Sequence, residues 1–343
     1  MADEEEPVPE PRETHILLGQ AEAEREFLHA FDTGRPAHAW LITGRQGIGK
    51  ATLAFRLART ILSGEAPDAH DPEAALFRRV ASGGHADLLV VERAVVERDK
   101  DENPVKRRAE ITVDDVRGVR EFLSKTPAEG GWRVVVIDSA DQMNTNAANA
   151  VLKILEEPPS RAMLLLLAHN PGRLLPTIIS RCRRLPAKPL GEEDLVELLV
   201  RLRPEMSIED QQILVQTADG SIGRALGYSK GGGLGLYRDA VALLENLPGL
   251  DVAGVHKLAD GVARDKTGEA FQTVGDLMRW WVHRTIDGQV RGSVSASAAG
   301  LDRWFEVWEK NNRLFERADS VNLDHKQVIL NAFAAIDAAH SSS

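Results

Sequence analysis

Short, continuous apolar runs alternate with amphipathic stretches over the first half of the chain. The apolar runs predict buried strands at Ala39–Thr43, Val134–Ile137 and Met163–Ala168. The stretches between them have helical spacing and predict helices over residues 20–31, 53–62, 112–125 and 146–156, with Thr112 as the N-cap of the third. Strands that are apolar on both faces and alternate with helices are typical of a parallel sheet covered by helices. The pattern therefore predicts an α/β fold.

The pattern changes after Pro189, where the strand signals end. Helical spacing recurs over residues 192–202, 208–218, 224–226 and onward, 237–245, 271–286, 301–318 and 326–339. Three consecutive glycines at 231–233 predict a hinge within this helical part. We therefore expect a tail at 1–14, an α/β domain at 15–187, a small helical domain at 188–230 and an all-helical domain at 231–340.

Charge is distributed unevenly along the chain. The formal net charge is −10, and half of it lies in a proline-rich run within the first 13 residues, which we interpret as disordered. The remaining body is mildly acidic, so non-specific coating of duplex DNA is not expected. The mixed-charge run at residues 93–108 is expected to be a solvated loop.

Cysteine content and hydropathy exclude further classes of protein. Cys182 is the one cysteine, which excludes a disulfide framework and a cysteine-based zinc module within the chain. We expect it to be a small buried residue rather than a reactive thiol. No run approaches the roughly 20 apolar residues of a membrane-spanning helix, and the acidic start is unlike a signal peptide. The expectation is a cytoplasmic protein without membrane contact.

The most specific chemical motif lies between the first strand and the helix that follows it. Gly44, Gly49 and Lys50 match the spacing G-x-x-x-x-G-K of a phosphate-binding loop, and Gly47 adds a further glycine. Glycines are needed because backbone N–H groups close around phosphate oxygens, where a Cβ would obstruct them. Lys50 is placed to reach the β- and γ-phosphates. The segment therefore predicts a nucleotide-binding loop of the P-loop class.

Two groups that ATP hydrolysis needs are missing, one directly after the glycine loop and one after the second predicted strand. The hydroxyl that binds Mg²⁺ is replaced by Ala51, and Thr52 lies about 100° further round the helix. The second strand ends in Asp138, which matches the carboxylate that holds Mg²⁺, but Ser139 follows where a general base is expected. The residues therefore favour a P-loop protein that does not hydrolyse ATP. They leave open whether ATP or ADP still binds.

Two longer segments resemble a known family. They are AANAVLKILEEPP at 147–159 and LLLLAHNPGRLLPTIISRCRRLP at 164–186, with supporting matches at 18–20, 36–40 and 220–226. Residues 15–230 resemble bacterial clamp-loader subunits of the AAA+ family, and the helical remainder resembles them only in pattern. The resemblance implies an AAA+ domain, a helical lid and a helical collar that joins subunits. The missing hydrolytic groups make the chain similar to the delta-prime type rather than to the gamma/tau motor.

The resemblance implies a role for Arg181 in the triplet Ser180–Arg181–Cys182. In clamp loaders this arginine is presented to ATP bound by the adjacent subunit. A fixed, planar cation suits the charge that develops on a transferring phosphoryl group. The alternative is that Arg181 forms a salt bridge within the chain.

Two further residues match sensor positions of the family. Arg224 in GSIGRAL matches the second sensor arginine, and the alternative is that it ties the lid to the P-loop domain. Asn170 falls at the first sensor position after the third strand, and the alternative is that it caps the next turn. Many relatives carry a four-cysteine zinc module after the P-loop helix. Residues 61–110 contain no cysteine, and His70 and His85 alone cannot make a tetrahedral site, so we expect no zinc.

The resemblance also implies partners. These are the gamma/tau motor subunits and the delta subunit and, through the complex, the sliding clamp, single-strand-binding protein and primed DNA. The chain is expected to be monomeric until partners are added. The helical collar contains four tryptophans that are candidates for either core or interface: Trp280, Trp281, Trp304 and Trp308.

Two other functions compete with this one. An active ATPase motor of the gamma/tau type is supported by the intact Gly44–Lys50 loop and Asp138 and opposed by Ala51 and Ser139. A DNA-remodelling AAA+ helicase is disfavoured by the LEEPP and Ser-Arg-Cys segments. The oligomer formed by the chain alone separates these classes, because a helicase forms hexamers.

Overall fold

The computed structural model describes residues 8–32, 36–66, 71–98, 104–129, 131–229, 233–265, 268–292, 298–321 and 323–341. The chain divides into two compact units. The first comprises Met1–Glu205 and Gly220–Gly223, and the second comprises Met206–Asp219 and Arg224–Ser343. The expected domain boundaries at 187/188 and 230/231 stay a prediction. Gly231 and Gly232 of the expected glycine hinge lie outside the described residues, and Gly233 is the first residue of a helix.

The first unit is built on a five-stranded parallel sheet with the strand order β2-β5-β6-β1-β7. Its strands are β1 (Ala39–Thr43), β2 (Leu88–Glu92), β5 (Arg133–Asp138), β6 (Ala162–Ala168) and β7 (Arg183–Pro186). The three central strands are the three that the apolar runs predict. The two edge strands were not predicted, because β7 begins with two arginines and β2 lies in an irregular stretch.

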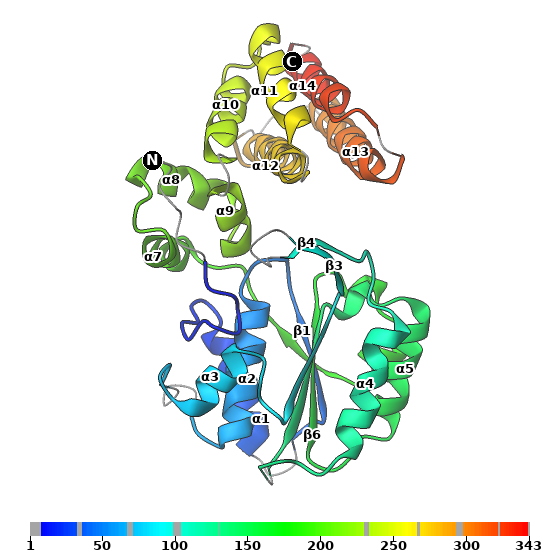
Figure 1. Ribbon diagram of the computed structural model, residues 1–343. Coiled ribbons are helices and arrows are strands. Elements are labelled where there is room, and N and C mark those ends of the chain that lie inside the picture. Colours follow the sequence, from blue (N-terminus) through cyan, green and yellow to red (C-terminus); the bar gives the residue numbers. More distant parts are fainter. Residues whose placement is uncertain are drawn as a thin grey trace. The chain divides into compact units, whose positions relative to one another are not determined.

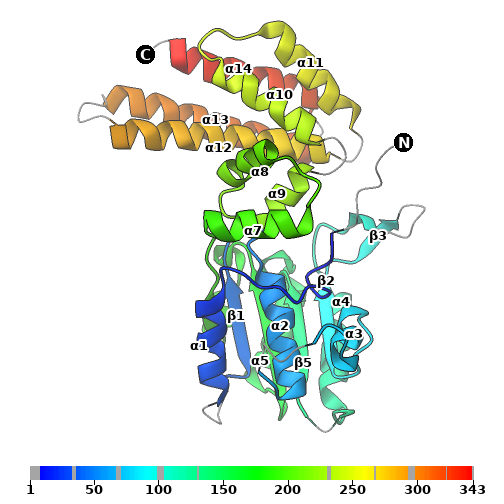
Figure 2. The ribbon, with the colours of Figure 1, turned by 90° about the vertical axis from the view of Figure 1, so that its left-hand side faces the viewer.

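Helices cover both faces of this sheet (Figure 1). One face packs against α1 (Ala21–Asp32), α2 (Lys50–Ser63) and α3 (Ala75–Ala81), which Figure 2 shows from the front. The other face packs against α4 (Val113–Ser124), α5 (Thr145–Glu156) and α6 (Pro176–Ile179). Side chains of β1, β5 and β6 alternate between the two cores, so these central strands are apolar on both sides. The predicted α/β fold with helices on both faces is confirmed.

Local signals fix where the helices of the second face begin and end. Thr112 forms a capping box with Asp115 at the start of α4, as the sequence predicts. The side chain of Asn144 accepts a hydrogen bond from the Ala147 amide at the start of α5. This helix ends at Glu156, shortly before two prolines at 158–159 that cannot continue it.

The mixed-charge segment is in part extended and paired, where the sequence suggested a solvated loop, and its residues 99–103 lie outside the described residues. It contains β3 (Val95–Arg98) and β4 (Pro104–Arg107), which pair antiparallel with Val95 opposite Arg107. The error has a physical reason: β-branched valines at 95, 96 and 105 favour extended backbone even among charged neighbours. The expectation of a loop is therefore wrong for these eight residues.

The described residues after β7 form further helices. They are α7 (Glu192–Leu202), α8 (Ile208–Thr217), α9 (Ile222–Ser229), α10 (Gly233–Glu245), α11 (Val252–Arg264), α12 (Glu269–Gly292), α13 (Ala298–Val321) and α14 (His325–Ser341). The sequence predicted all of these except α11, whose helical spacing is weakened by two glycines. None of the described helices is both long enough and apolar enough to span a bilayer.

The tryptophans of the second unit have different environments. Trp304 is 1% exposed and packs with Trp281 at 5.9 Å between ring centroids, so Trp304 belongs to the core of the helical bundle. Trp308, one turn later on α13, is 40% exposed. Trp280 is half-buried and lies under the guanidinium of Arg284.

Candidate functional site

The loop at Gly44–Lys50 connects β1 to α2. Gly44, Gly47 and Gly49 all have positive φ angles of 151°, 77° and 94°, which other residues rarely adopt. At Gly44 a Cβ would also lie 2.7 Å from the carbonyl oxygen of Ala187, so the backbone just after β7 leaves no room for a side chain. The glycines that the motif predicts are therefore required by the conformation of the loop.

Five consecutive carbonyl groups of this loop accept hydrogen bonds. Lys50 Nζ donates to the first two, those of Gly44 at 2.7 Å and Arg45 at 2.6 Å. The next three accept from residues outside the loop: Gln46 from Ser221 Oγ at 2.9 Å, Gly47 from the Gly223 amide at 2.9 Å, and Ile48 from Gln20 Nε2 at 3.0 Å. The loop conformation is thus held both by its own lysine and by segments distant in sequence.

Lys50 is buried beside two carboxylates. Lys50 as a whole is only 3% exposed to solvent. Burial lowers the pKa of the amine to about 8, although the charges of Asp138 and Asp141 act in the opposite direction. The structure therefore brings Lys50 and Asp138 together, as the P-loop pattern predicts, and adds Asp141, which sequence reasoning did not single out.

Ser139 forms a hydrogen-bonded chain with Asp138 and His169. Its Oγ lies 2.7 Å from Asp138 Oδ1 and 2.8 Å from His169 Nε2. An ionised carboxylate only accepts, so the single hydroxyl proton goes to Asp138 and His169 Nε2–H donates to Ser139. Burial and the charge of Lys50 lower the pKa of His169, which keeps the ring neutral at pH 7. The group at position 139 is therefore a neutral hydroxyl whose proton goes to Asp138, and it is too weak a base to take a proton from water.

Asp141 organises the end of β6. Its two carboxylate oxygens accept from the amides of His169 at 3.0 Å and Asn170 at 2.8 Å. The side chain of Asn170 accepts from the Gly172 amide at 3.1 Å and so caps the short 3₁₀ turn Pro171–Arg173. This is the capping geometry that the sequence offered as the alternative to a sensor, and the sensor role stays a prediction. A polar residue directly after an apolar strand was the signal that could have found His169.

The other two residues that the sequence predicts to contact nucleotide, Thr52 and Arg224, lie in different surroundings. Thr52 is half-buried in the first turn of α2, next to Ala51. Arg224 belongs to the second unit, where its Nε lies 3.8 Å from Asp276 Oδ2. Its predicted contact with phosphate is untested.

Arg181 follows the short helix α6 and is held at the surface. Its Nη1 donates to the carbonyl of Thr177 at 3.0 Å, and its Nη2 donates to Glu156 Oε1 at 2.9 Å. The next residue, Cys182, is buried in the core, and burial raises the pKa of its thiol to about 12. The triplet is thus anchored by Cys182, while the Arg181 side chain remains 36% exposed. The structure pairs Arg181 with Glu156 rather than with the residues of the loop.

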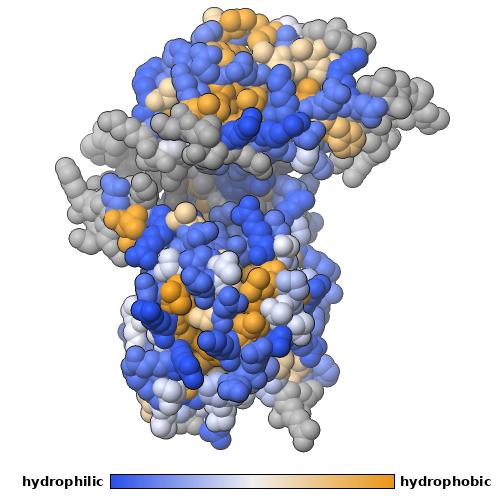
Figure 3. Space-filling model, turned by 90° about the vertical axis from the view of Figure 1, so that its right-hand side faces the viewer, coloured by the Kyte–Doolittle hydropathy of each residue, from blue (hydrophilic) through white to orange (hydrophobic). Residues whose placement is uncertain are grey.

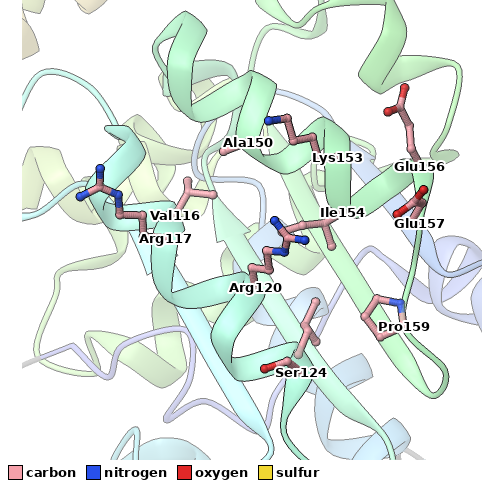
Figure 4. A pocket seen from close by; sticks show the side chains of 11 residues that line it. Val116, Arg117, Arg120, Ser124, Ala150, Lys153, Ile154, Glu156, Glu157 and Pro159 are labelled. Carbon is pink, nitrogen blue, oxygen red and sulfur yellow. The ribbon is translucent and has the colours of Figure 1, made fainter.

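A groove lies between α4 and α5, on the face of the first unit that Figure 3 shows, where apolar patches lie among charged side chains. It has a volume of about 570 Å³. Glu156 and Glu157 line one end of it, and Lys153 lies one turn before them on α5 (Figure 4). Glu156 therefore belongs both to this groove and to the ion pair with Arg181.

Comparison of the sequence with known proteins identifies its family. The family model "DNA polymerase III, delta subunit" matches residues 19–191, which is half of the chain. A DNA polymerase III subunit delta' of Pseudomonas aeruginosa is 38% identical over 187 residues, covering 54% of this chain and 53% of that protein. The corresponding protein of Bacillus subtilis is 34% identical over 172 residues, covering 50% of this chain and 48% of that one.

The subunit tau of Bacillus subtilis is more distant. It is 24% identical over 279 residues, covering 78% of this chain and 46% of that protein. The chain spans about half the length of the curated relatives it matches. The matched range contains the glycine loop, Asp138, Ser139 and Arg181. This chain therefore belongs to the DNA polymerase III delta-prime subunit family.

Proposed function

We propose that this chain serves as a delta-prime-type subunit of the DNA polymerase III clamp loader, an AAA+ stator that does not hydrolyse ATP. In this role it donates Arg181 in trans to ATP held by a neighbouring motor subunit and so supports loading of the sliding clamp. The observation that carries the proposal is the chain Asp138–Ser139–His169, in which the group at the general-base position is already bound on both sides.

The absence of hydrolysis follows from two positions. Ala51 offers no oxygen to Mg²⁺ at the start of α2. Ser139 is 2% exposed and gives its only proton to Asp138, so it neither polarises nor deprotonates an attacking water. Each loss costs orders of magnitude in rate. Binding of ATP or ADP without turnover is compatible with the glycine loop and Lys50, and the role needs neither bound nucleotide nor zinc.

The exposure of Arg181 supports its role in trans. Its ion pair with Glu156 is solvent-exposed on both sides, with side chains 36% and 44% exposed. Exposed ion pairs of this kind contribute roughly 0–1 kcal/mol to stability. A purely structural role within the chain would therefore contribute little, whereas an exposed guanidinium on a buried anchor suits a phosphate carried by another subunit.

The partners follow from the same assignment. They are the gamma/tau motor subunits and the delta subunit, and through them the sliding clamp, single-strand-binding protein and primed DNA in the bacterial cytoplasm. We expect the chain alone to elute as a monomer in size-exclusion chromatography and to enter a complex when motor and delta subunits are added.

Steady-state ATP hydrolysis tests the proposal. The chain with Mg²⁺ should be silent alone and should raise the turnover of added motor subunits. Arg181→Ala should abolish most of that increase, because arginine fingers contribute roughly 10³–10⁵ in rate. Arg184→Ala is the matched control, since Arg184 is also exposed and has no ion-pair partner among the described residues. Unchanged stimulation by Arg181→Ala would contradict the role in trans.

The competing function is an active motor of the gamma/tau type, favoured by the intact glycine loop and by Lys50 beside Asp138. The same assay distinguishes it. If the chain alone hydrolyses ATP and Lys50→Ala abolishes that activity, the chain is a motor, and the inference from Ala51 and Ser139 is wrong.

A further inference from the structure

We infer that Glu156 is a positioning residue for Arg181, whose carboxylate orients the guanidinium toward the phosphate of a neighbouring subunit. The inference rests on the proposed function, because it needs Arg181 to act in trans. It adds a residue at the end of α5 whose role depends on a contact between segments 25 positions apart.

The guanidinium of Arg181 is held at two points. Glu156 Oε1 accepts from Nη2 at 2.9 Å, and the Thr177 carbonyl accepts from Nη1 at 3.0 Å. A guanidinium has five N–H donors in one plane. Two bonds on its two terminal nitrogens fix the orientation of that plane and leave three N–H groups for phosphate oxygens.

Both acceptors lie on rigid supports. α5 packs into the core through Val151 and Leu155, and it ends at Glu156 just before two prolines. Thr177 lies on α6, next to Ile178, which is completely buried in the same core. A side chain on a helix end of this kind holds its partner more precisely than one on a loop. The frame that orients Arg181 is therefore fixed before a neighbour arrives.

The adjacent carboxylate provides a contrast. Glu157 is also exposed and lines the same end of the groove beside Glu156 (Figure 4). Among the described residues, however, the side chain of Glu157 has no ion-pair or hydrogen-bond partner. The two glutamates have the same charge and adjacent positions. They differ in that Glu156 contacts Arg181 and Glu157 does not. A variant of Glu157 therefore controls for the loss of negative charge at this surface.

The expected effect is on turnover and not on nucleotide binding. ATP is bound by the neighbouring subunit, so the KM for ATP should not change when Arg181 is misoriented. A misplacement of about 1 Å costs up to roughly 100-fold in rate. We expect Glu156→Ala to lower the stimulated kcat about tenfold. Glu156→Gln keeps an oxygen acceptor in place and should stay within about threefold of the wild type, because the positioning acts through the hydrogen bond.

The experiment uses the complete chain assembled with motor and delta subunits, and measures kcat and KM for ATP. The variants are Arg181→Ala, Glu156→Ala, Glu156→Gln, Glu157→Ala and the double variant Arg181→Ala/Glu156→Ala. Glu157→Ala should match the wild type. The double variant should be no slower than Arg181→Ala alone, since a positioning residue has nothing to orient once the arginine is gone.

The outcomes separate the two proposals. If Arg181→Ala lowers kcat but Glu156→Ala does not, or if Glu156→Gln falls as far as Glu156→Ala, the positioning role is overturned and the function stands. If Arg181→Ala has no effect, the proposed function itself fails. Circular dichroism and size-exclusion elution first establish that each variant folds and assembles. Glu156→Asp, which shortens the carboxylate by one methylene and should lower kcat like Glu156→Ala, replaces that variant if it does not fold.

Discussion

Lys50 shows how a single side chain can match a motif and still serve its own fold. The P-loop pattern places its amine toward phosphate, and in this structure the amine donates to the carbonyls of Gly44 and Arg45. Both bonds stabilise the loop against the repulsion of its own backbone oxygens. A phosphate in the loop would have to compete with these two carbonyls for the same amine.

The titration of Lys50 should reveal its burial. Its pKa is lowered from 10.5 to about 8, so it should lose its proton well before exposed lysines do. Between these values the unfolded chain binds the extra proton, so this amine makes the folded state more stable as the pH rises from 8 to 10.5. NMR of lysine ¹³Cε signals, assigned with Lys50→Met, measures the midpoint directly. A midpoint near 10.5 would show that the amine is solvated.

Helix α9 is tightly packed at Gly223 and has open space at Gly227. Its first residues lie against the glycine loop, where the Gly223 amide donates to the Gly47 carbonyl at 2.9 Å. A Cβ at Gly223 would lie 2.7 Å from Gly47 Cα, which is backbone and cannot move aside cheaply. At Gly227, one turn later in the same helix, a Cβ would meet nothing within 4 Å.

These two glycines make a matched pair of variants. Gly223→Ala should destabilise the loop by roughly 1–3 kcal/mol through overpacking. Gly227→Ala should instead stabilise the helix by up to about 1 kcal/mol, because alanine is the better helix former. Hydrogen exchange of the amides in residues 44–50 and in α9 reports both effects. Slower exchange in both variants would show that the loop accommodates a methyl group at 223.

Contacts between distant segments hold the first unit together around the loop. Gln20 is 2% exposed, and its side chain donates to the carbonyls of Ile48 and Lys188 and accepts from the Lys188 amide. It thereby joins the start of α1, the glycine loop and the segment that follows β7. The segment Gly220–Gly223 also belongs to this unit, although its neighbours on both sides in sequence belong to the other.

Replacement of Gln20 should weaken this whole arrangement. Gln20→Leu leaves one buried and two partly buried backbone groups without their partner and should destabilise the first unit by about 2–3 kcal/mol. Lys188→Ala is the control: it removes only the exposed ion pair with Glu22 and keeps both backbone bonds, so it should change stability by less than about 1 kcal/mol. Hydrogen exchange in β1 measures both. An equal effect of the two variants would mean that Gln20 has no special role.

Local patterns in the chain were enough to predict the three central strands, the glycine loop, the Thr112 cap and most helices. Each depends on residues close together in sequence, where burial on both faces, a cap or a required glycine leaves a readable signal. The replacement of the Mg²⁺-binding hydroxyl by Ala51 is also visible in the sequence alone, because Ala51 directly follows Lys50.

The remaining features arise from residues far apart in the chain. The edge strands β2 and β7 are extended because the sheet offers them partners, although their own residues give weak signals. Ser139 also accepts a hydrogen bond from His169, which lies 30 residues later in the chain. Glu156 meets Arg181, and Gln20 meets Lys188, across 25 and 168 residues. A local pattern contains no information on such pairs, because folding alone brings the side chains within hydrogen-bonding distance.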